Sequence, residues 1–253
     1  MGRDVNIVFL TTGDPVYLPA FFDRVLRDYS SQTRAVHIVP PLYKGQTVFR
    51  AFWRYFRTFG LRGVWGLTAL TAQAKWRRAS IRAVCARHGV PCSPVSDVND
   101  PAFVDGLRQA GTDLIVSVSC PQIFKHPLLD APSRGCLNIH GGLLPQYRGV
   151  MPSFWMLANG EREAGVSIYF MNDRIDAGEL CRQHAFDIRP DETLDAFLRR
   201  SKAFAAELLV EVLGEIDAGD IDRAPLDLTK GSYYSWPDRA AVRRFYEAGR
   251  RLV

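Results

Sequence analysis

The sequence predicts an α/β fold in which helices flank a mostly parallel sheet. Short apolar runs alternate with amphipathic helical patterns through the first half of the chain, which is the order of strand–helix–strand units. One run, 113–119, is apolar almost throughout, as are strands that are buried on both faces of a parallel sheet. Ligands bind such sheets beyond the carboxyl ends of the strands, so we expect functional residues in the loops there.

The first half of the chain begins with an apolar run that we expect to be the first strand. It ends in a turn that contains Gly13, Asp14 and Pro15. This turn has neither a Gly-x-Gly-x-x-Gly run nor a Walker lysine, which argues against dinucleotide and P-loop chemistry. The elements expected here are a strand at 5–12, a helix at 18–29, a strand at 35–39, helices at 46–59 and 74–88, and the strand at 113–119.

The second half is expected to add further strands, one long helix and a short helical tail. Apolar residues recur at helical spacing over 191–218, where Asp191 is suited to cap the start and Gly219 to end the helix. Asp238 is placed to cap a short last helix. The strands expected before the long helix lie at 136–140, 165–170 and 179–188.

Composition excludes several classes of protein. The chain of 253 residues has no uncharged apolar stretch of the roughly 18 residues that a membrane span needs, and no secretory leader pattern, so we expect a cytoplasmic protein. Its five cysteines are odd in number and none are spaced as Cys-x-x-Cys, which argues against a disulfide framework and against a zinc site. No metal is expected.

Charge is distributed unevenly along the chain. The net charge is +5, yet no Asp or Glu occurs between Asp28 and Asp97. A region of one sign this long makes a positive field and predicts an anionic partner. The eleven basic residues of the interval are Arg34, Lys44, Arg50, Arg54, Arg57, Arg62, Lys75, Arg77, Arg78, Arg82 and Arg87.

An aromatic stripe lies inside this basic interval, and its role is open. The favoured interpretation is a face that packs on the core or on a second copy in a homodimer, with solvated arginines beside it. A second interpretation is an interfacial helix that reaches a lipid-linked sugar. A third is a basic, aromatic surface for tRNA. The residues of the stripe are Phe49, Phe52, Trp53, Phe56 and Phe59.

Three polar residues stand where chemistry is expected. Asn138 and His140 share one face of the strand at 136–140, because side chains alternate along a strand. Two glycines follow them, and Asp176 lies in a turn between two expected strands. Acyl transfer to an amine needs a donor to the developing oxyanion, a group that moves protons and an anion that orients that group. Asn, His and Asp supply these roles, although Asn-x-His alone is more often a structural pair.

Four ordered motifs resemble those of the folate-dependent formyltransferases, which include glycinamide ribonucleotide transformylase, methionyl-tRNA formyltransferase and the sugar N-formyltransferases. The resemblance covers about 113–218 well and is only topological before that. It implies a Rossmann-like formyltransferase fold, with 1–218 as the catalytic domain and 219–253 as a tail packed on it. The motifs are Asn138-Ile139-His140, Leu143–Gly149, Asn159-Gly160-Glu161 with Gly165–Ile168, and Asp176–Glu179.

This resemblance implies N10-formyltetrahydrofolate as the formyl donor. Asn138 and a protonated His140 would stabilise the oxyanion of the tetrahedral intermediate, and Asp176 would keep His140 charged and help to remove the proton of the amine. The pterin would lie between two loops, in which Cys120-Pro121-Gln122 departs from the family's commoner Tyr-Gly. The cofactor-binding residues implied are Ser119, Cys120, Pro121, Gln122, Ile123, Asp173 and Gly178.

The acceptor amine is the least determined feature. Only 219–253 follow the long helix, which is shorter than the further barrel usual in methionyl-tRNA formyltransferases, and the first turn lacks the Gly-Ser-Asn loop of glycinamide ribonucleotide transformylases. These differences favour a layout like the sugar N-formyltransferases, with a nucleotide-linked amino sugar as substrate. Methionyl-tRNA, another small amine and a non-catalytic folate- or nucleotide-binding module remain alternatives. The candidate substrate-binding residues are Gly13, Asp14, Tyr147 and Arg148.

Overall fold

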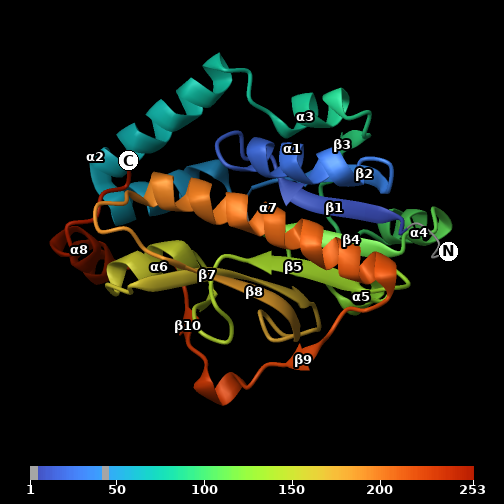
Figure 1. Ribbon diagram of the computed structural model, residues 1–253. Helices are drawn as coiled ribbons and strands as arrows, with labels where there is room; N and C mark the ends of the chain where they lie inside the picture. The colour runs from blue at the N-terminus through green and yellow to red at the C-terminus, as the bar shows by residue number, and fades with distance from the viewer. Residues whose placement is uncertain (1–4, 42–45) are drawn as a thin grey trace.

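The computed structural model describes residues 5–41 and 46–253; Lys44 of the basic interval lies outside them. An eight-stranded sheet runs through the molecule in the order β3-β2-β1-β4-β5-β7-β8-β9, with helices on both faces (Figure 1). β3, β2, β1, β4 and β5 are parallel, whereas β7, β8 and β9 are antiparallel to their neighbours. The predicted α/β class with a mostly parallel sheet is confirmed.

The six predicted strands lie close to their expected ranges, whereas β3, β6, β9 and β10 were not predicted. A separate parallel pair, β6 with β10, joins two loops that are far apart in the sequence. The strands are β1 Ile7–Thr12, β2 Thr33–Val39, β3 Cys92–Pro94, β4 Leu114–Val118, β5 Cys136–His140, β6 Arg148–Gly149, β7 Glu163–Phe170, β8 Glu179–Asp187, β9 Ala224–Pro225 and β10 Tyr233–Tyr234.

The helices differ from the expectation in several places. The helix expected over 46–59 continues to Trp76, and the helices at 101–109, 126–129 and 152–158 were not predicted. The long helix begins at Leu194, where the hydroxyl of Thr193 accepts from the main chain, so the expected cap at Asp191 was wrong. The expected helix over 74–88 was also wrong, because Arg78 has a left-handed φ of 52° and Ser80 caps a new helix. The helices are α1 Leu18–Tyr29, α2 Val48–Trp76, α3 Ile81–Arg87, α4 Pro101–Gln109, α5 His126–Leu129, α6 Pro152–Ala158, α7 Leu194–Ala218 and α8 Arg239–Glu247, with a 3-10 turn at Leu228–Lys230.

Two apolar layers cover the two faces of the sheet. Ile7 and Phe9 of β1 belong to the larger layer, which also contains the apolar faces of α1, α3, α6, α7 and α8. Val8 and Leu10 point to the other layer, with residues of α4 and α5. This alternation buries both faces of the central strands, and it leaves the loops beyond their carboxyl ends as the place for polar function.

Helix α2 is only partly integrated into the fold. Gly60, with φ 65° and ψ −165°, interrupts the helix, and the half that follows extends along the edge of the molecule in Figure 1. Of the five stripe residues, Phe59 is buried and Phe56 half-buried, whereas Phe49, Phe52 and Trp53 are exposed. The interpretation of the stripe as a core face therefore holds for one residue of the five.

Residues 219–253 contact four separate parts of the fold. β9 extends the sheet beyond β8, and β10 pairs with β6. The ring of Phe245 in α8 stacks on that of Phe154 in α6, with 5.1 Å between centroids. The last residue, Val253, lies against Gly66 of α2, where a Cβ would come within 3.1 Å of its side chain. The segment thus connects α2, α6 and the loop that follows β5.

Candidate active site

Strands β5 and β7 bring the first two polar groups of the site together. In the antiparallel pair, Asn138 stands directly opposite Tyr169. The Asn138 amide Nδ2 donates to the Tyr169 hydroxyl at 3.0 Å, and that hydroxyl donates to Oδ1 of Asp176 at 2.8 Å. A hydrogen-bonded chain therefore runs from Asn138 through Tyr169 to Asp176.

Asp176 occupies the turn between β7 and β8 in a strained conformation. Its φ is 48°, in the left-handed region, and it is only 7% exposed. The second carboxylate oxygen, Oδ2, accepts from the Gly149 amide at 2.7 Å. Two residues later, a Cβ on Gly178 would lie 1.8 Å from the main-chain oxygen of Phe170, so only glycine fits there. Tyr169 of β7 and Gly149 of β6 thus hold the two oxygens of the carboxylate.

His140 ends β5 and is 6% exposed. Its Nε2 lies 2.8 Å from the carbonyl oxygen of Tyr147, and because a carbonyl only accepts, Nε2 carries a proton. Nδ1 then faces Oδ1 of Asp176 at 3.8 Å. The structure thus places the three predicted catalytic residues in one site.

Tyr169 is the site residue that the sequence analysis missed. Burial, reinforced by the charge of Asp176, raises the pKa of its phenol well above the ordinary value, so the hydroxyl keeps its proton. Only two polar side chains, Ser167 and Tyr169, occur in the apolar run 164–170. They alternate along β7, and Ser167 accepts from the Leu144 amide at 3.0 Å. The spacing of two residues between Ser167 and Tyr169 puts both side chains on one face of the strand, and this was the sequence signal that could have identified Tyr169.

Tyr147 and Arg148 were predicted to bind substrate, and the structure gives them defined partners. The Tyr147 ring stacks on Tyr234 at 5.1 Å, and its hydroxyl donates to Glu161, which belongs to the Asn-Gly-Glu motif. The Arg148 guanidinium donates to the Ile175 carbonyl at 2.9 Å, directly before Asp176. Arg148 thus lies beside the site, whereas the hydroxyl of Tyr147 is already engaged in its hydrogen bond to Glu161.

The predicted cofactor loop follows β4. Ser119 has a left-handed φ of 54°, and Gln122 fixes the loop because its side chain accepts from the Val98 amide and donates to the Ser96 carbonyl, both at 2.9 Å. The half-buried Cys120 has its pKa raised to about 11 by desolvation. The remaining candidates of this set are half-buried Pro121, exposed Ile123, exposed Asp173 and buried Gly178.

The loops after β1 and β4 meet at Lys202 of α7. Its ammonium donates to the Ser119 hydroxyl at 3.0 Å. Desolvation lowers the pKa of Lys202, and the carboxylate of Asp14 opposes that shift. Asp14 itself holds the turn after β1, because Oδ1 accepts from the Val16 amide at 2.7 Å, and Gly13 precedes it there. Nothing in the local sequence distinguishes Lys202 from the other basic residues of its helix.

A model of the formyl transferase family matches residues 71–213, which is more than half of the chain. The chain belongs to the formyl transferase family. The matched segment of this formyl transferase includes Asn138, His140, Tyr169 and Asp176. Gly13, Asp14 and the first half of α2 lie outside it.

The relatives of this formyl transferase fall into two groups. Methionyl-tRNA formyltransferase of Geobacter sulfurreducens is 37% identical over 147 residues, which are 58% of this chain and 46% of that protein. The chain spans about half the length of the curated relatives it matches. Solved structures share the fold at lower identity.

Two of these structures illustrate the range. The N-formyltransferase of Helicobacter canadensis, in complex with folinic acid and dTDP-3-aminofucose, is 15% identical with a TM-score of 0.59, covering 91% of this chain and 71% of that one. Glycinamide ribonucleotide transformylase 1 of Symbiobacterium toebii is 20% identical with a TM-score of 0.62, covering 90% and 96%. At these identities the likeness shows the fold alone.

Proposed function

We propose that this protein transfers a formyl group from N10-formyltetrahydrofolate to a primary amine, which is most simply the amino group of a nucleotide-linked sugar. Membership of the formyl transferase family supports the reaction class. The observation that carries the proposal is the buried chain from Asn138 through Tyr169 to Asp176, with His140 beside it. This set of donors and one carboxylate suits attack by an amine on a formyl carbon.

The donor set fits the charge that develops in such a reaction. N10-formyltetrahydrofolate, when bound, supplies the formyl carbon. The Asn138 amide has two N–H groups and uses one on Tyr169, so the other is available to the formyl oxygen. The ring nitrogens of His140 face the Tyr147 carbonyl and Asp176, so a charged His140 would act on the formyl oxygen as a nearby positive charge and not through a free N–H. Both groups act where negative charge appears on oxygen, which is where preorganised donors accelerate acyl transfer most.

In this proposal Asp176 transfers the proton of the amine to N10. A carbon–nitrogen bond forms to the amine while the bond from the formyl carbon to N10 breaks, and the proton of the amine ends on N10. Asp176 accepts that proton, directly or through a water molecule, and returns it. Because Tyr169 and the Gly149 amide already hold both oxygens, the carboxylate stays oriented through the transfer.

Two observations support a nucleotide-linked amino sugar as the acceptor. The loops after β1 and β4 converge on the Lys202 ammonium, a cation suited to a diphosphate. The Helicobacter canadensis protein, which shares this fold, is described in complex with a dTDP-linked amino sugar. Arg148 lies next to the Asp176 turn and adds a second positive charge near the reacting groups.

A second candidate acceptor is methionyl-tRNA. The curated relatives that match at 34–37% identity are methionyl-tRNA formyltransferases. The basic, aromatic helix α2 is also the kind of surface that binds nucleic acid. For tRNA, affinity should fall steeply as salt rises, because phosphate contacts release counterions.

The test is a comparison of acceptors with the purified protein. N10-formyltetrahydrofolate is mixed with a panel of nucleotide-linked amino sugars or with methionyl-tRNA, and both tetrahydrofolate release and the formylated product are followed by mass spectrometry. We expect product from one amino sugar, formed at least about a hundredfold more slowly by the Asp176→Asn variant. Product from methionyl-tRNA alone would overturn the sugar assignment, and absence of transfer to every primary amine would overturn the reaction.

A further inference from the structure

Helix α2 carries an unusual number of large apolar side chains on the surface. Trp65 and Trp76 are 77% and 89% exposed, and Phe49 is 70% exposed. Three of the five tryptophans of the chain lie in this one helix. Scattered exposed apolar residues are normal, but a concentration on one element marks an interaction surface.

The inner face of α2 shows how the helix is anchored. Phe59 packs edge-on against Phe154 of α6, with 5.6 Å between centroids. In the second half, Gly63 and Gly66 lie against Leu252 and Val253 of the carboxyl terminus. These contacts fix the helix on one side. The other side of the helix is exposed in the described part of the chain, so Trp65 and Trp76 do not pack against its core.

The exposed residues of the first half form a preassembled aromatic patch. Phe49, Phe52, Trp53 and Phe56 follow one another at helical spacing. Phe49 and Trp53 meet edge-to-face at 6.0 Å, and Phe52 stacks on Phe56 at 6.4 Å. The rings contact each other rather than a buried neighbour. Their arrangement therefore costs little further ordering when something apolar covers them.

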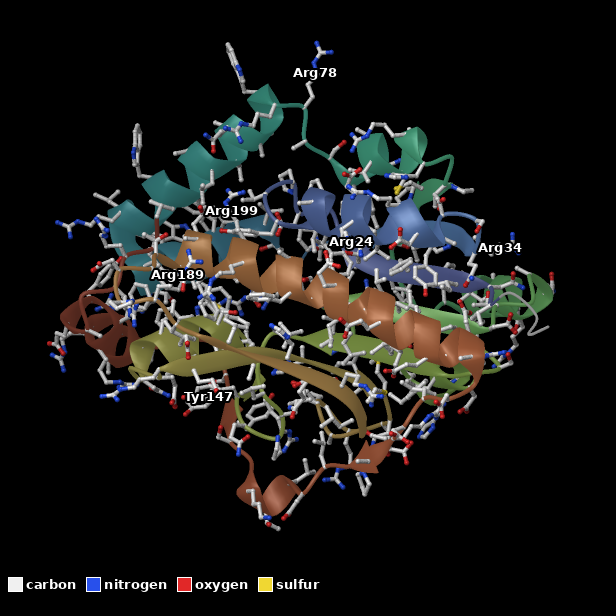
Figure 2. All side chains as sticks on the ribbon, viewed as in Figure 1. Arg24, Arg34, Arg78, Tyr147, Arg189 and Arg199 are labelled. Carbon is white, nitrogen blue, oxygen red and sulfur yellow. The ribbon has the colours of Figure 1, made fainter. Side chains whose placement is uncertain are left out.

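Arginines flank the aromatic patch on one side. Arg50, Arg54 and Arg57 also follow at helical spacing, one residue along from the aromatic positions. A groove of about 560 Å³ between α2 and the start of α8 combines both chemistries, with Phe49, Trp53, Arg57 and Arg239 in its lining. Beyond the end of α2, Arg78 points away from the body of the molecule (Figure 2). The surface is thus apolar along one line and cationic along the next.

We propose that α2 is an interfacial helix that docks this protein on an anionic lipid bilayer. The aromatic side chains would lie at the boundary between headgroups and acyl chains, where tryptophan is favoured, and the exposed Arg50 and Arg57 would reach the lipid phosphates. No helix in the described part of the chain is long and apolar enough to cross a membrane, so the contact is with the surface. This proposal does not depend on the reaction.

Two features favour a bilayer over the other partners. A second copy of α2 would bring one acid-free basic interval, 29–96, against another, which is repulsive. Nucleic acid would satisfy the arginines and could stack on the aromatic rings. It would leave the exposed aliphatic residues Val48, Leu61 and Leu67 without a partner, whereas lipid covers them.

Vesicle sedimentation tests the proposal directly. The full chain is mixed with vesicles of phosphatidylcholine alone, or of phosphatidylcholine and phosphatidylglycerol in equal parts. Two triple variants remove the two chemistries separately: F49S/W65S/W76S and R50Q/R57Q/R62Q. The matched control, R27Q/R108Q/R162Q, makes the same charge change at exposed arginines elsewhere. The Tm of each variant is measured to check that it keeps the fold.

We expect the protein to bind the anionic vesicles and not the neutral ones. The R50Q/R57Q/R62Q variant should lose about a hundredfold in affinity, since each basic residue near the surface contributes about fivefold. F49S/W65S/W76S should lose at least as much, and the control should bind within a few-fold of the unaltered protein. Equal loss in the control, or no binding to either vesicle, would overturn the proposal.

A second measurement separates lipid from the other occupants. Brominated phospholipids quench tryptophans that enter the bilayer, so quenching should be strong in the unaltered protein and largely absent in W53S/W65S/W76S. Trp155 is buried and should contribute little. If the aromatic variant instead abolishes self-association without vesicles, the surface is a dimer interface. If α2 variants weaken tRNA binding but not vesicle binding, it is a nucleic-acid surface. Either result overturns the lipid proposal.

Discussion

The hydroxyl of Tyr169 lies 2.8 Å from Oδ1 of Asp176, and the strand position opposite Tyr169 is Asn138. One phenol therefore sets the orientation of both an amide and a carboxylate. We expect Tyr169→Phe to lower kcat about tenfold to a hundredfold, because a buried hydrogen bond to a charged group is worth about 1.5–3 kcal/mol. KM for the folate should change little, since Tyr169 acts through its neighbours.

The control for this prediction is Tyr29→Phe. Its hydroxyl donates to the Val210 carbonyl at 3.3 Å, far from the site, so the same chemical change is made without touching the chain from Asn138 to Asp176. If both variants lose the same fraction of kcat, the role assigned to Tyr169 is wrong. A loss confined to KM in Tyr169→Phe would point to direct substrate contact instead.

Asp176→Asn tests the assignment of the proton acceptor. Asparagine keeps the shape, and its carbonyl oxygen can still accept from one donor, but it cannot take a proton. We expect turnover to fall about 10²–10⁴-fold. His140→Ala should abolish turnover as well, while circular dichroism and Tm show an intact fold. Near-normal rates in either variant would remove the proposed mechanism.

Lys202→Met tests whether the ammonium recognises an anionic acceptor. The change removes one cation near Ser119 and keeps the length of the side chain. KM for a diphosphate-linked amino sugar should rise about tenfold or more, because a charge-assisted hydrogen bond is lost. KM for an uncharged amine should not change. The exposed Lys230 offers the matched control, and an equal effect of Lys230→Met would contradict the role of Lys202.

Thiol chemistry gives a prediction that depends on pH. Burial raises the pKa of Cys120 and Cys181 to about 11 and that of Cys85 and Cys136 to about 12. A raised thiol pKa leaves less thiolate at neutral pH, so alkylation at pH 7.5 should be about two orders of magnitude slower than for free cysteine.

Mass spectrometry of the alkylated protein checks this expectation. The rates should rise about tenfold per pH unit and level off only near pH 11 or above, and unfolding in guanidinium should make all five cysteines react rapidly. Fast labelling of Cys120 in the native protein at pH 7.5 would show that the loop after β4 is more open than the structure has it.

Much of the site could be predicted from local pattern. Asn138 and His140 share a face because a strand has a period of two, and Asp176 stands in a turn that its own residues define. Tyr169 was harder, because its partner across the sheet depends on antiparallel register, which is a non-local property. Lys202 reaches the site only through the packing of α7, and no sequence signal marks that position.

The least predictable element was α2. Gly60, Gly63 and Gly66 each lower helix propensity, which favoured an end near Phe59. In the fold, Gly63 and Gly66 allow Leu252 and Val253 to approach closely, so tertiary contact outweighs propensity. The exposure of the aromatic stripe could not be predicted either, since apolar residues at helical spacing normally indicate a buried face.

The pairing of β6 with β10 ties the active site to the end of the chain. The amides of Arg148 and Val150 donate to the carbonyls of Ser232 and Tyr234, and Gly149 between them donates to Asp176. These three amides should therefore exchange their hydrogens together, as one cooperative unit. The free energy of that opening should equal the free energy of detaching residues 232–234 from the loop. Residues 232–234 lie more than fifty residues after Asp176 in sequence, yet their local unfolding would release one oxygen of its carboxylate. The stability of the catalytic turn therefore depends on a distant part of the chain.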